Sequence, residues 1–323
     1  MNIVVYGVGR SGTKAIQLYL AYMAAIRSGK VHINYEPYLW INRKTRLLNY
    51  EGYLYNSTSP QFATDANEFS KKHRAYISRL VEGKNEVVTK FIRGNGRIRA
   101  INEIIAPDET VIIIRDLYEV LISLLRTEWN FWSVGFDFHV DWFKFVEEVR
   151  KKEIIDNIDW CLSQLNGLID RNAFYWYVMN VAALNNQGKN LYIISYGDID
   201  AINPLGKEFY KLDYMQQVSD PCFNGELLHK NYPLTSNESR MLLQDIINSF
   251  LHKSKISSKF KFVIKTTQLG SEAQINLAPL NENKRTIKPV GISMEKKDIF
   301  EFFNEDIKKR INAHPNLVKS SIS

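Results

Sequence analysis

The amino-acid sequence predicts an α/β fold in which helices flank a central parallel sheet. Short β-branched apolar runs recur along the chain, segments of helical spacing alternate with them, and a glycine-rich turn follows the first run. Strands that alternate with helices imply right-handed crossovers and a sheet covered on both faces. In such sheets, ligands bind at the carboxyl ends of the strands. We therefore expect the functional residues to follow the strands.

The elements follow one another in a regular order. The first strand is expected at residues 3–6, before a loop at 7–12 and a helix that Gly29 ends as a C-cap. A second strand at 31–35 stops at Glu36-Pro37. Later strands are expected at 87–90, 110–114 and 191–195, with helices at 118–126 and 174–185.

The chain of 323 residues is long for one domain and short for two, so we expect a single domain over residues 1–323. Its core should extend to about residue 250, and a basic C-terminal extension should cover about 251–323. Five lysines fall in that extension without an acidic residue between them, and they form either a substrate-facing arm or a solvated surface. These are Lys253, Lys255, Lys259, Lys261 and Lys265. The polar stretch 49–67 should be a long loop or an excursion from the core, and the tail from about Pro315 should be loose.

Charge and cysteine content limit the functional classes. The excess of 42 Lys and Arg over 35 Asp and Glu gives a net charge of +7, which suits an anionic ligand but is too diffuse to imply nucleic acid. Cys161 and Cys222 lack metal-ligand spacing, so we expect two buried free thiols rather than one disulfide, and no metal. No apolar run is long enough for a transmembrane segment, and no signal peptide precedes the first strand. We expect a cytoplasmic protein if the chain begins natively at Met1.

The loop Gly7-Val8-Gly9-Arg10-Ser11-Gly12-Thr13-Lys14 joins a buried strand to a helix. Its backbone N–H groups and the positive end of the helix dipole form an anion site. Arg10 and Lys14 add positive charge, and Thr13 adds a hydroxyl donor. These features predict a phosphate-binding loop.

Two known classes of phosphate-binding loop fit this sequence only in part. The nucleotide triphosphatase pattern would need lysine where Thr13 stands. Lys14 comes one position late, and the Ala15 that follows it cannot ligand Mg²⁺. The dinucleotide pattern is met by Gly7, Gly9 and Gly12, with Glu36 after the second strand, but it has little use for the loop's two cations. An NAD(P)-dependent oxidoreductase, a small-molecule kinase and a non-catalytic nucleotide-binding protein all stay open as alternatives.

A second anion site is predicted after the strand at 110–114. Arg115 stands at the carboxyl end of that strand, and Ser123 follows eight residues later on the next helix. An arginine at the mouth of a sheet needs an anion, and a nearby serine can donate to the same oxygens. The simpler alternative is that Arg115 pairs with Asp116 or another carboxylate, and that Ser123 only fills a helix position.

Together, the two sites resemble those of the sulfotransferase family that uses 3′-phosphoadenosine 5′-phosphosulfate. Arg10-Ser11-Gly12-Thr13 is similar to the family's 5′-phosphosulfate loop, and the spacing of Arg115 and Ser123 matches its 3′-phosphate site. Ser195-Tyr196-Gly197-Asp198 looks like the family's Tyr-Glu-Asp, whereas Leu117 replaces a usual proline. The resemblance covers about residues 3–198 and implies a P-loop-like three-layer fold. It assigns binding of the co-substrate to Arg10, Ser11, Gly12, Thr13, Lys14, Arg115 and Ser123.

The resemblance also implies catalytic roles. Arg10 would stand at the bridging oxygen with support from Lys14, and Lys90 would touch the transferring sulfuryl group. Tyr35-Glu36-Pro37 resembles the motif of carbohydrate-directed members, so Glu36 is the predicted base, held extended by the proline. Members that act on phenols carry a histidine where this chain has Phe91-Ile92-Arg93. His139 is the second candidate for the base.

The acceptor implied by the resemblance is a hydroxyl of a carbohydrate or glycolipid, and peripheral membrane contact would suit the latter. An aromatic cluster could stack on sugar rings, although such a stretch is more often the core face of a helix. The cluster comprises Trp129, Phe131, Trp132, Phe136, Phe138, Trp142, Phe143 and Phe145.

Overall fold

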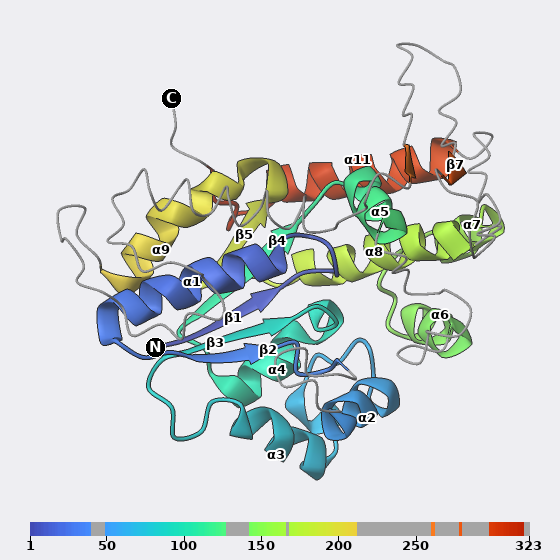
Figure 1. Cartoon of the computed structure of the whole chain (residues 1–323). Coiled ribbons are helices and arrows are strands. Elements are labelled where there is room, and N and C mark those ends of the chain that lie inside the picture. Colours follow the sequence, from blue (N-terminus) through green and yellow to red (C-terminus); the bar gives the residue numbers. More distant parts are fainter. Residues whose placement is uncertain are drawn as a thin grey trace.

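A computed structural model describes residues 1–39, 49–126, 142–165, 168–211, 260–261, 278–279 and 297–319. At its centre lies a five-stranded sheet of order β2-β3-β1-β4-β5 in which every neighbouring pair is parallel (Figure 1). The strands are β1 Asn2–Tyr6, β2 His32–Tyr35, β3 Val87–Phe91, β4 Glu109–Ile114 and β5 Leu191–Ser195. The prediction of a three-layer α/β fold with a central parallel sheet is confirmed.

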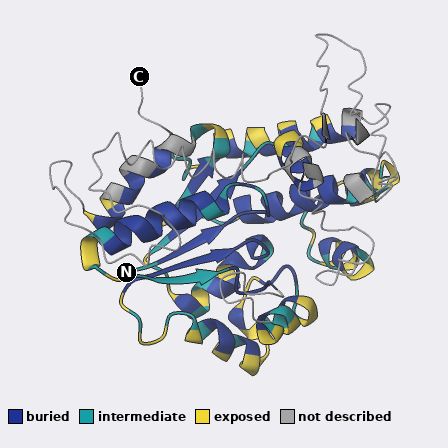
Figure 2. Cartoon of the chain, in the orientation of Figure 1, coloured by how far each residue is buried: buried dark blue, intermediate teal, exposed yellow. Residues whose placement is uncertain are grey.

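Helices cover both faces of this sheet. Along β1, Ile3 and Val5 belong to a core under α1 and α9, whereas Val4 and Tyr6 belong to a core with α4 and α8. This alternation follows from the two-residue period of a strand. Figure 2 shows both cores as buried segments on either side of the strands. The main helices are α1 Thr13–Ser28, α2 Tyr50–Thr58, α3 Lys71–Arg79, α4 Ile98–Ile105, α5 Leu117–Arg126, α6 Trp142–Lys151, α7 Ile158–Ser163, α8 Leu168–Leu184, α9 Ile202–Tyr210 and α11 Lys297–Ala313.

Glycine sets both ends of α1. Gly12 precedes the helix with φ +90°, and Gly29 follows it with φ +73°. The N–H of Gly29 donates to the carbonyl of Ala25 at 2.8 Å, so the predicted C-cap is confirmed.

The prediction of a long loop at 49–67 is wrong, because the segment contains α2 and the short 3-10 helix Ala66–Glu68. Asn49 caps α2 by accepting from the N–H of Gly52 at 3.1 Å. At its other end, the buried guanidinium of Arg97 donates to the carbonyls of Asn56 and Ser59. A tertiary contact therefore stabilises a helix whose sequence is mostly polar.

The prediction of a loose tail from about Pro315 is also wrong for the residues that follow α11. Ile193 of β5 donates its N–H to Asn316 and accepts from Val318, both at 2.9 Å. This pairing covers the outer edge of β5 with the end of the described chain. Cys161 is a buried free thiol as predicted, whereas Cys222 lies outside the described residues.

The predicted basic arm falls mostly outside the described residues. Lys261 belongs to β6 (Phe260–Lys261), which pairs antiparallel with β7 (Ala278–Pro279). Lys253, Lys255, Lys259 and Lys265 are not described. Across the part of the chain that the structure describes, no helix is both long and apolar enough to cross a membrane.

Candidate functional site

The predicted site residues from four strands meet at one edge of the sheet. Because every strand is parallel, all the carboxyl ends lie at the same edge. The strand order then sets the spatial order of the residues along that edge. They are Glu36 after β2, Lys90 at the end of β3, the glycine-rich loop after β1, Arg115 after β4 and Tyr196 after β5.

The glycine-rich loop has the properties of an anion site. Arg10 adopts a left-handed conformation with φ +76°, and the first turn of α1 contains no acidic side chain. Ser11 is fully buried, and its Oγ has no hydrogen-bond partner within the described chain. A buried hydroxyl without a partner is costly, so a ligand that bonds to it would recover that free energy.

Two glycines allow this loop to lie close to its neighbours. A Cβ on Gly7 would stand 2.8 Å from the carbonyl oxygen of Ile113. A Cβ on Gly12 would stand 2.5 Å from Cε2 of Tyr196, and φ is +90° there. The loop therefore packs directly against β4 and against the residue that follows β5.

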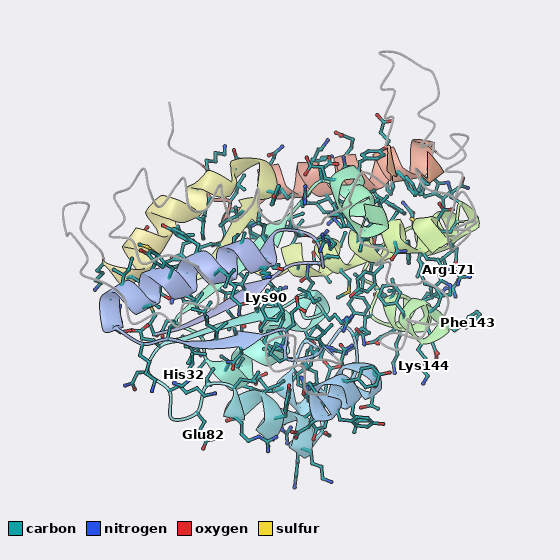
Figure 3. All side chains as sticks on the ribbon, viewed as in Figure 1. His32, Glu82, Lys90, Phe143, Lys144 and Arg171 are labelled. Carbon is teal, nitrogen blue, oxygen red and sulfur yellow. The ribbon has the colours of Figure 1, made fainter. Side chains whose placement is uncertain are left out.

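A buried ion pair joins the ends of β2 and β3. Lys90 Nζ donates to Glu36 Oε1 at 2.6 Å, and the two side chains are 1% and 7% exposed. Tyr35 lies opposite Lys90 in the β2–β3 register, which places Nζ 3.7 Å from the centre of the Tyr35 ring. Lys14 approaches the same ring at 5.7 Å. One aromatic ring thus contacts a lysine from the loop and a lysine from β3. Figure 3 labels Lys90 in the interior of the molecule.

The predicted extended conformation of Glu36 is wrong. Glu36 has φ +52°, which is left-handed and uncommon for a residue before proline. Its carbonyl accepts from the N–H of Leu39 at 2.9 Å, closing a turn around Pro37 and Tyr38. The turn and the buried bond to Lys90 together hold a conformation that Pro37 alone would disfavour. Such strain is concentrated at functional sites.

Arg115 connects the end of β4 with the glycine-rich loop. Its Nη1 donates to the carbonyl of Arg10 at 3.2 Å, and its Nε donates to Glu119 at 2.6 Å. The guanidinium carbon lies 4.3 Å from the centre of the Tyr196 ring. The predicted alternative, in which Arg115 pairs with Asp116 or another carboxylate, is the arrangement observed, because Glu119 is the partner of Arg115.

Two aromatic residues, Tyr196 and Trp176, also contact Arg115. Burial raises the pKa of Tyr196 against the opposing effect of the Arg115 guanidinium, so its phenol stays protonated at neutral pH. Trp176 of α8 donates to the carbonyl of Arg115 at 3.1 Å. The arginine is thus held at its backbone and can direct its charge toward the sheet edge.

Some predicted site residues lie outside the described part of the chain. The backbone of Ser123 lies on α5, but its side chain is not described. His139 lies entirely outside the described residues. Within the aromatic cluster, Trp142, Phe143 and Phe145 are described. Phe145 is fully buried, as a core face requires, whereas Phe143 is 81% exposed on α6 (Figure 3).

No sequence pattern indicates the two residues that hold the Arg115 turn, Trp176 and Asn304. Asn304 of α11 accepts from the N–H of Leu117 at 3.0 Å and donates to Asp116 at 2.7 Å. Asn304 lies 188 residues from Asp116 in the chain, so no local pattern connects them. Only the packing of α11 against α5 and α8 brings them together.

The strand order bears on the dinucleotide alternative. In the classic dinucleotide-binding sheet, the second strand lies next to the first, so its acidic end reaches the ribose beside the loop. Here β3 separates β2 from β1, and the Glu36 carboxylate is bonded to Lys90. The geometry does not offer Glu36 to a ribose beside the glycine-rich loop.

The comparisons with known proteins and the search for metal ligands add no assignment. No protein-family model matches the chain, and no curated protein matches it. Among the described residues, no group of three or more His, Cys, Asp or Glu side chains is placed to hold a metal ion. The chemistry of the sheet edge is therefore what indicates a function.

Proposed function

We propose that this protein is a sulfotransferase that uses 3′-phosphoadenosine 5′-phosphosulfate. The observation that carries the proposal is the contact of Arg115 Nη1 with the Arg10 carbonyl at 3.2 Å. This contact joins two positively charged sites that could each bind an anion. They follow the adjacent strands β1 and β4 and so form one continuous surface. A nucleotide with phosphate at both ends of its ribose matches such a pair of sites.

The glycine-rich loop fits the 5′ end of that nucleotide. The N-terminus of α1 and Ser11 Oγ offer donors, while Arg10 and Lys14 offer positive charge. The co-substrate supplies a sulfuryl group on a phosphate leaving group. Arg10 and Lys14 neutralise the charge that develops on the leaving oxygen, which is the main electrostatic requirement of such a displacement. Arg115 and Ser123 take the 3′-phosphate.

The Glu36–Lys90 pair supplies the proton chemistry. An acceptor hydroxyl oxygen forms a bond to sulfur while the bond from sulfur to the bridging oxygen breaks, and the leaving phosphate keeps that electron pair. Glu36 takes the hydroxyl proton, and Lys90, 2.6 Å from its carboxylate, orients it and faces the sulfuryl oxygens. The acceptor is a carbohydrate or glycolipid hydroxyl.

The test begins with ligand-dependent melting temperatures. Adenosine 3′,5′-bisphosphate at a hundred times its dissociation constant should stabilise the protein by about 2.7 kcal/mol, whereas NAD and ATP should not. Transfer of labelled sulfate from the co-substrate to a panel of sugars and glycolipids then tests catalysis.

The control is Arg115→Ala, which should lose most of the stabilisation by the bisphosphate. Stabilisation by NAD or ATP alone would contradict the proposal in favour of an oxidoreductase or a kinase. Stabilisation by the bisphosphate without transfer to any acceptor would favour a protein that only binds the nucleotide.

A further inference from the structure

The C-terminal helix α11 contacts the turn that carries Arg115. Its Asn304 is 4% exposed and makes two hydrogen bonds to that turn. The Oδ1 atom accepts from the N–H of Leu117 at 3.0 Å, and Nδ2 donates to Asp116 Oδ2 at 2.7 Å. Lys308, one turn later on α11, lies 3.8 Å from the same carboxylate oxygen.

Asp116 transmits this contact to α5. Its Oδ1 accepts from the N–H groups of Tyr118 at 2.9 Å and Glu119 at 3.4 Å, which caps the first turn of α5. Glu119 in turn accepts from Arg115 Nε. Asn304 therefore fixes the Asp116 carboxylate, which caps α5. The same helix carries Glu119, the partner of Arg115.

The turn is held from the other side by α8, where Trp176 donates to the Arg115 carbonyl at 3.1 Å. Asn304 and Trp176 together fix the backbone on both sides of the Arg115–Asp116 peptide. Among the described residues, the guanidinium bonds to the carbonyl of Arg10 in the loop and lies over the ring of Tyr196, so its direction depends on this backbone.

We propose that Asn304 is a positioning residue for the 3′-phosphate, which makes α11 part of the nucleotide site. This inference rests on the proposed function. Asn304 does not touch the nucleotide; it holds the Asp116 cap so that Arg115 points at the phosphate. Its loss should weaken recognition of the 3′-phosphate and leave the 5′ end, held by the glycine-rich loop, nearly unchanged.

The experiment compares the affinities of adenosine 3′,5′-bisphosphate and adenosine 5′-monophosphate by titration calorimetry. Asn304→Asp places two carboxylates face to face, and Asp116→Asn places two amide donors face to face. Each should lower the preference for the bisphosphate by about tenfold, the scale of one hydrogen bond to a charged group. The double variant N304D/D116N reverses the polarity of the same bond and should recover the preference to within about threefold.

Asn312→Ala is the matched control, because Asn312 is an exposed asparagine on the same helix, and it should keep the full preference. Asp116→Asn keeps an oxygen to cap α5, so it should fold even if Asn304→Asp does not, and a full preference in it overturns the inference. A double variant no better than the single variants also overturns it. If the unmodified protein shows no preference, the proposed function fails and the inference falls with it.

Discussion

The two ends of the candidate site hold the same kind of ion pair in different surroundings. At the β2–β3 end, Lys90 and Glu36 are 1% and 7% exposed. At the β4–β5 end, Arg115 and Glu119 pair at the same 2.6 Å but are 12% and 51% exposed. The buried pair is strong and fixed because water does not screen it, whereas the half-exposed pair contributes little. An anion can therefore replace Glu119 at Arg115 at little cost, while nothing comparable displaces Glu36 from Lys90.

The largest effect should come from breaking the buried pair. Glu36→Gln removes the proposed base, so sulfate transfer should fall about 10²- to 10⁴-fold while affinity for the bisphosphate stays nearly constant. It also leaves the Lys90 charge buried without its carboxylate, which should lower the free energy of unfolding by about 3–5 kcal/mol. Initial rates, calorimetry and urea unfolding measure the three quantities.

Glu119→Gln is the matched variant at the other end, and it should lower the free energy of unfolding by only about 0–1 kcal/mol. Equal losses of stability in the two variants would contradict the contrast between the two pairs. Unchanged transfer in Glu36→Gln would remove Glu36 from the mechanism.

Acid should act on the β2–β3 end through His73. This fully buried side chain of α3 lies 2.8 Å from both the Tyr38 hydroxyl and the Ser59 hydroxyl, and burial lowers its pKa to about 3. The unfolded chain, with a pKa near 6.5, binds a proton that the folded chain rejects. Stability is therefore complete above about pH 6.5 and falls as the pH drops toward 3, by about 2 kcal/mol between pH 7 and 5.

Urea unfolding at several pH values measures that slope. His73→Gln keeps hydrogen-bonding groups for Tyr38 and Ser59 but cannot titrate in this range, so its stability should lack most of the decline. An unaltered slope in His73→Gln would assign the acid sensitivity to other groups.

A further effect concerns the β4–β5 end. Gly12→Ala introduces a Cβ 2.5 Å from the Tyr196 ring at φ +90°, whereas Gly29→Ala has a similar φ of +73° and no atom within 4 Å. Both substitutions lower the free energy of unfolding because an alanine disfavours the left-handed backbone. Only Gly12→Ala must also displace the ring of Tyr196, on which Arg115 stacks. Thermal unfolding should place Gly12→Ala about 1–3 kcal/mol below Gly29→Ala. Equal losses would mean that Tyr196 yields freely.

The sequence predicted the strands well because most of them are short β-branched runs buried in a parallel sheet, whereas β2, which is only half-buried, shows an alternating pattern instead. Because ligands bind at the carboxyl ends of parallel strands, the predicted strands also predict that Glu36, Lys90 and Arg115 lie at one edge of the sheet. The conformation of Glu36 was mispredicted because the preference imposed by Pro37 yields to a turn and to Lys90, 54 residues away. The helix α2 and the role of Asn304 were not predicted for the same reason. Each depends on a contact with a residue far away in the sequence. Their partners, Arg97 and Asp116, are not visible in local patterns.

The central place of β1 in the sheet has a consequence for biosynthesis. Both neighbours of this strand, β3 and β4, are translated later, and β4 ends only at Ile114. At about 5–20 residues per second, the ribosome needs about 5–20 s to add the intervening hundred or so residues. Until β3 has been translated through Phe91, Ile3-Val4-Val5-Tyr6 has no neighbouring strand to pair with, which leaves an apolar β segment exposed on the nascent chain, and its second neighbour is complete only at Ile114. The segment around which the sheet is built is thus the one that waits longest for its partners.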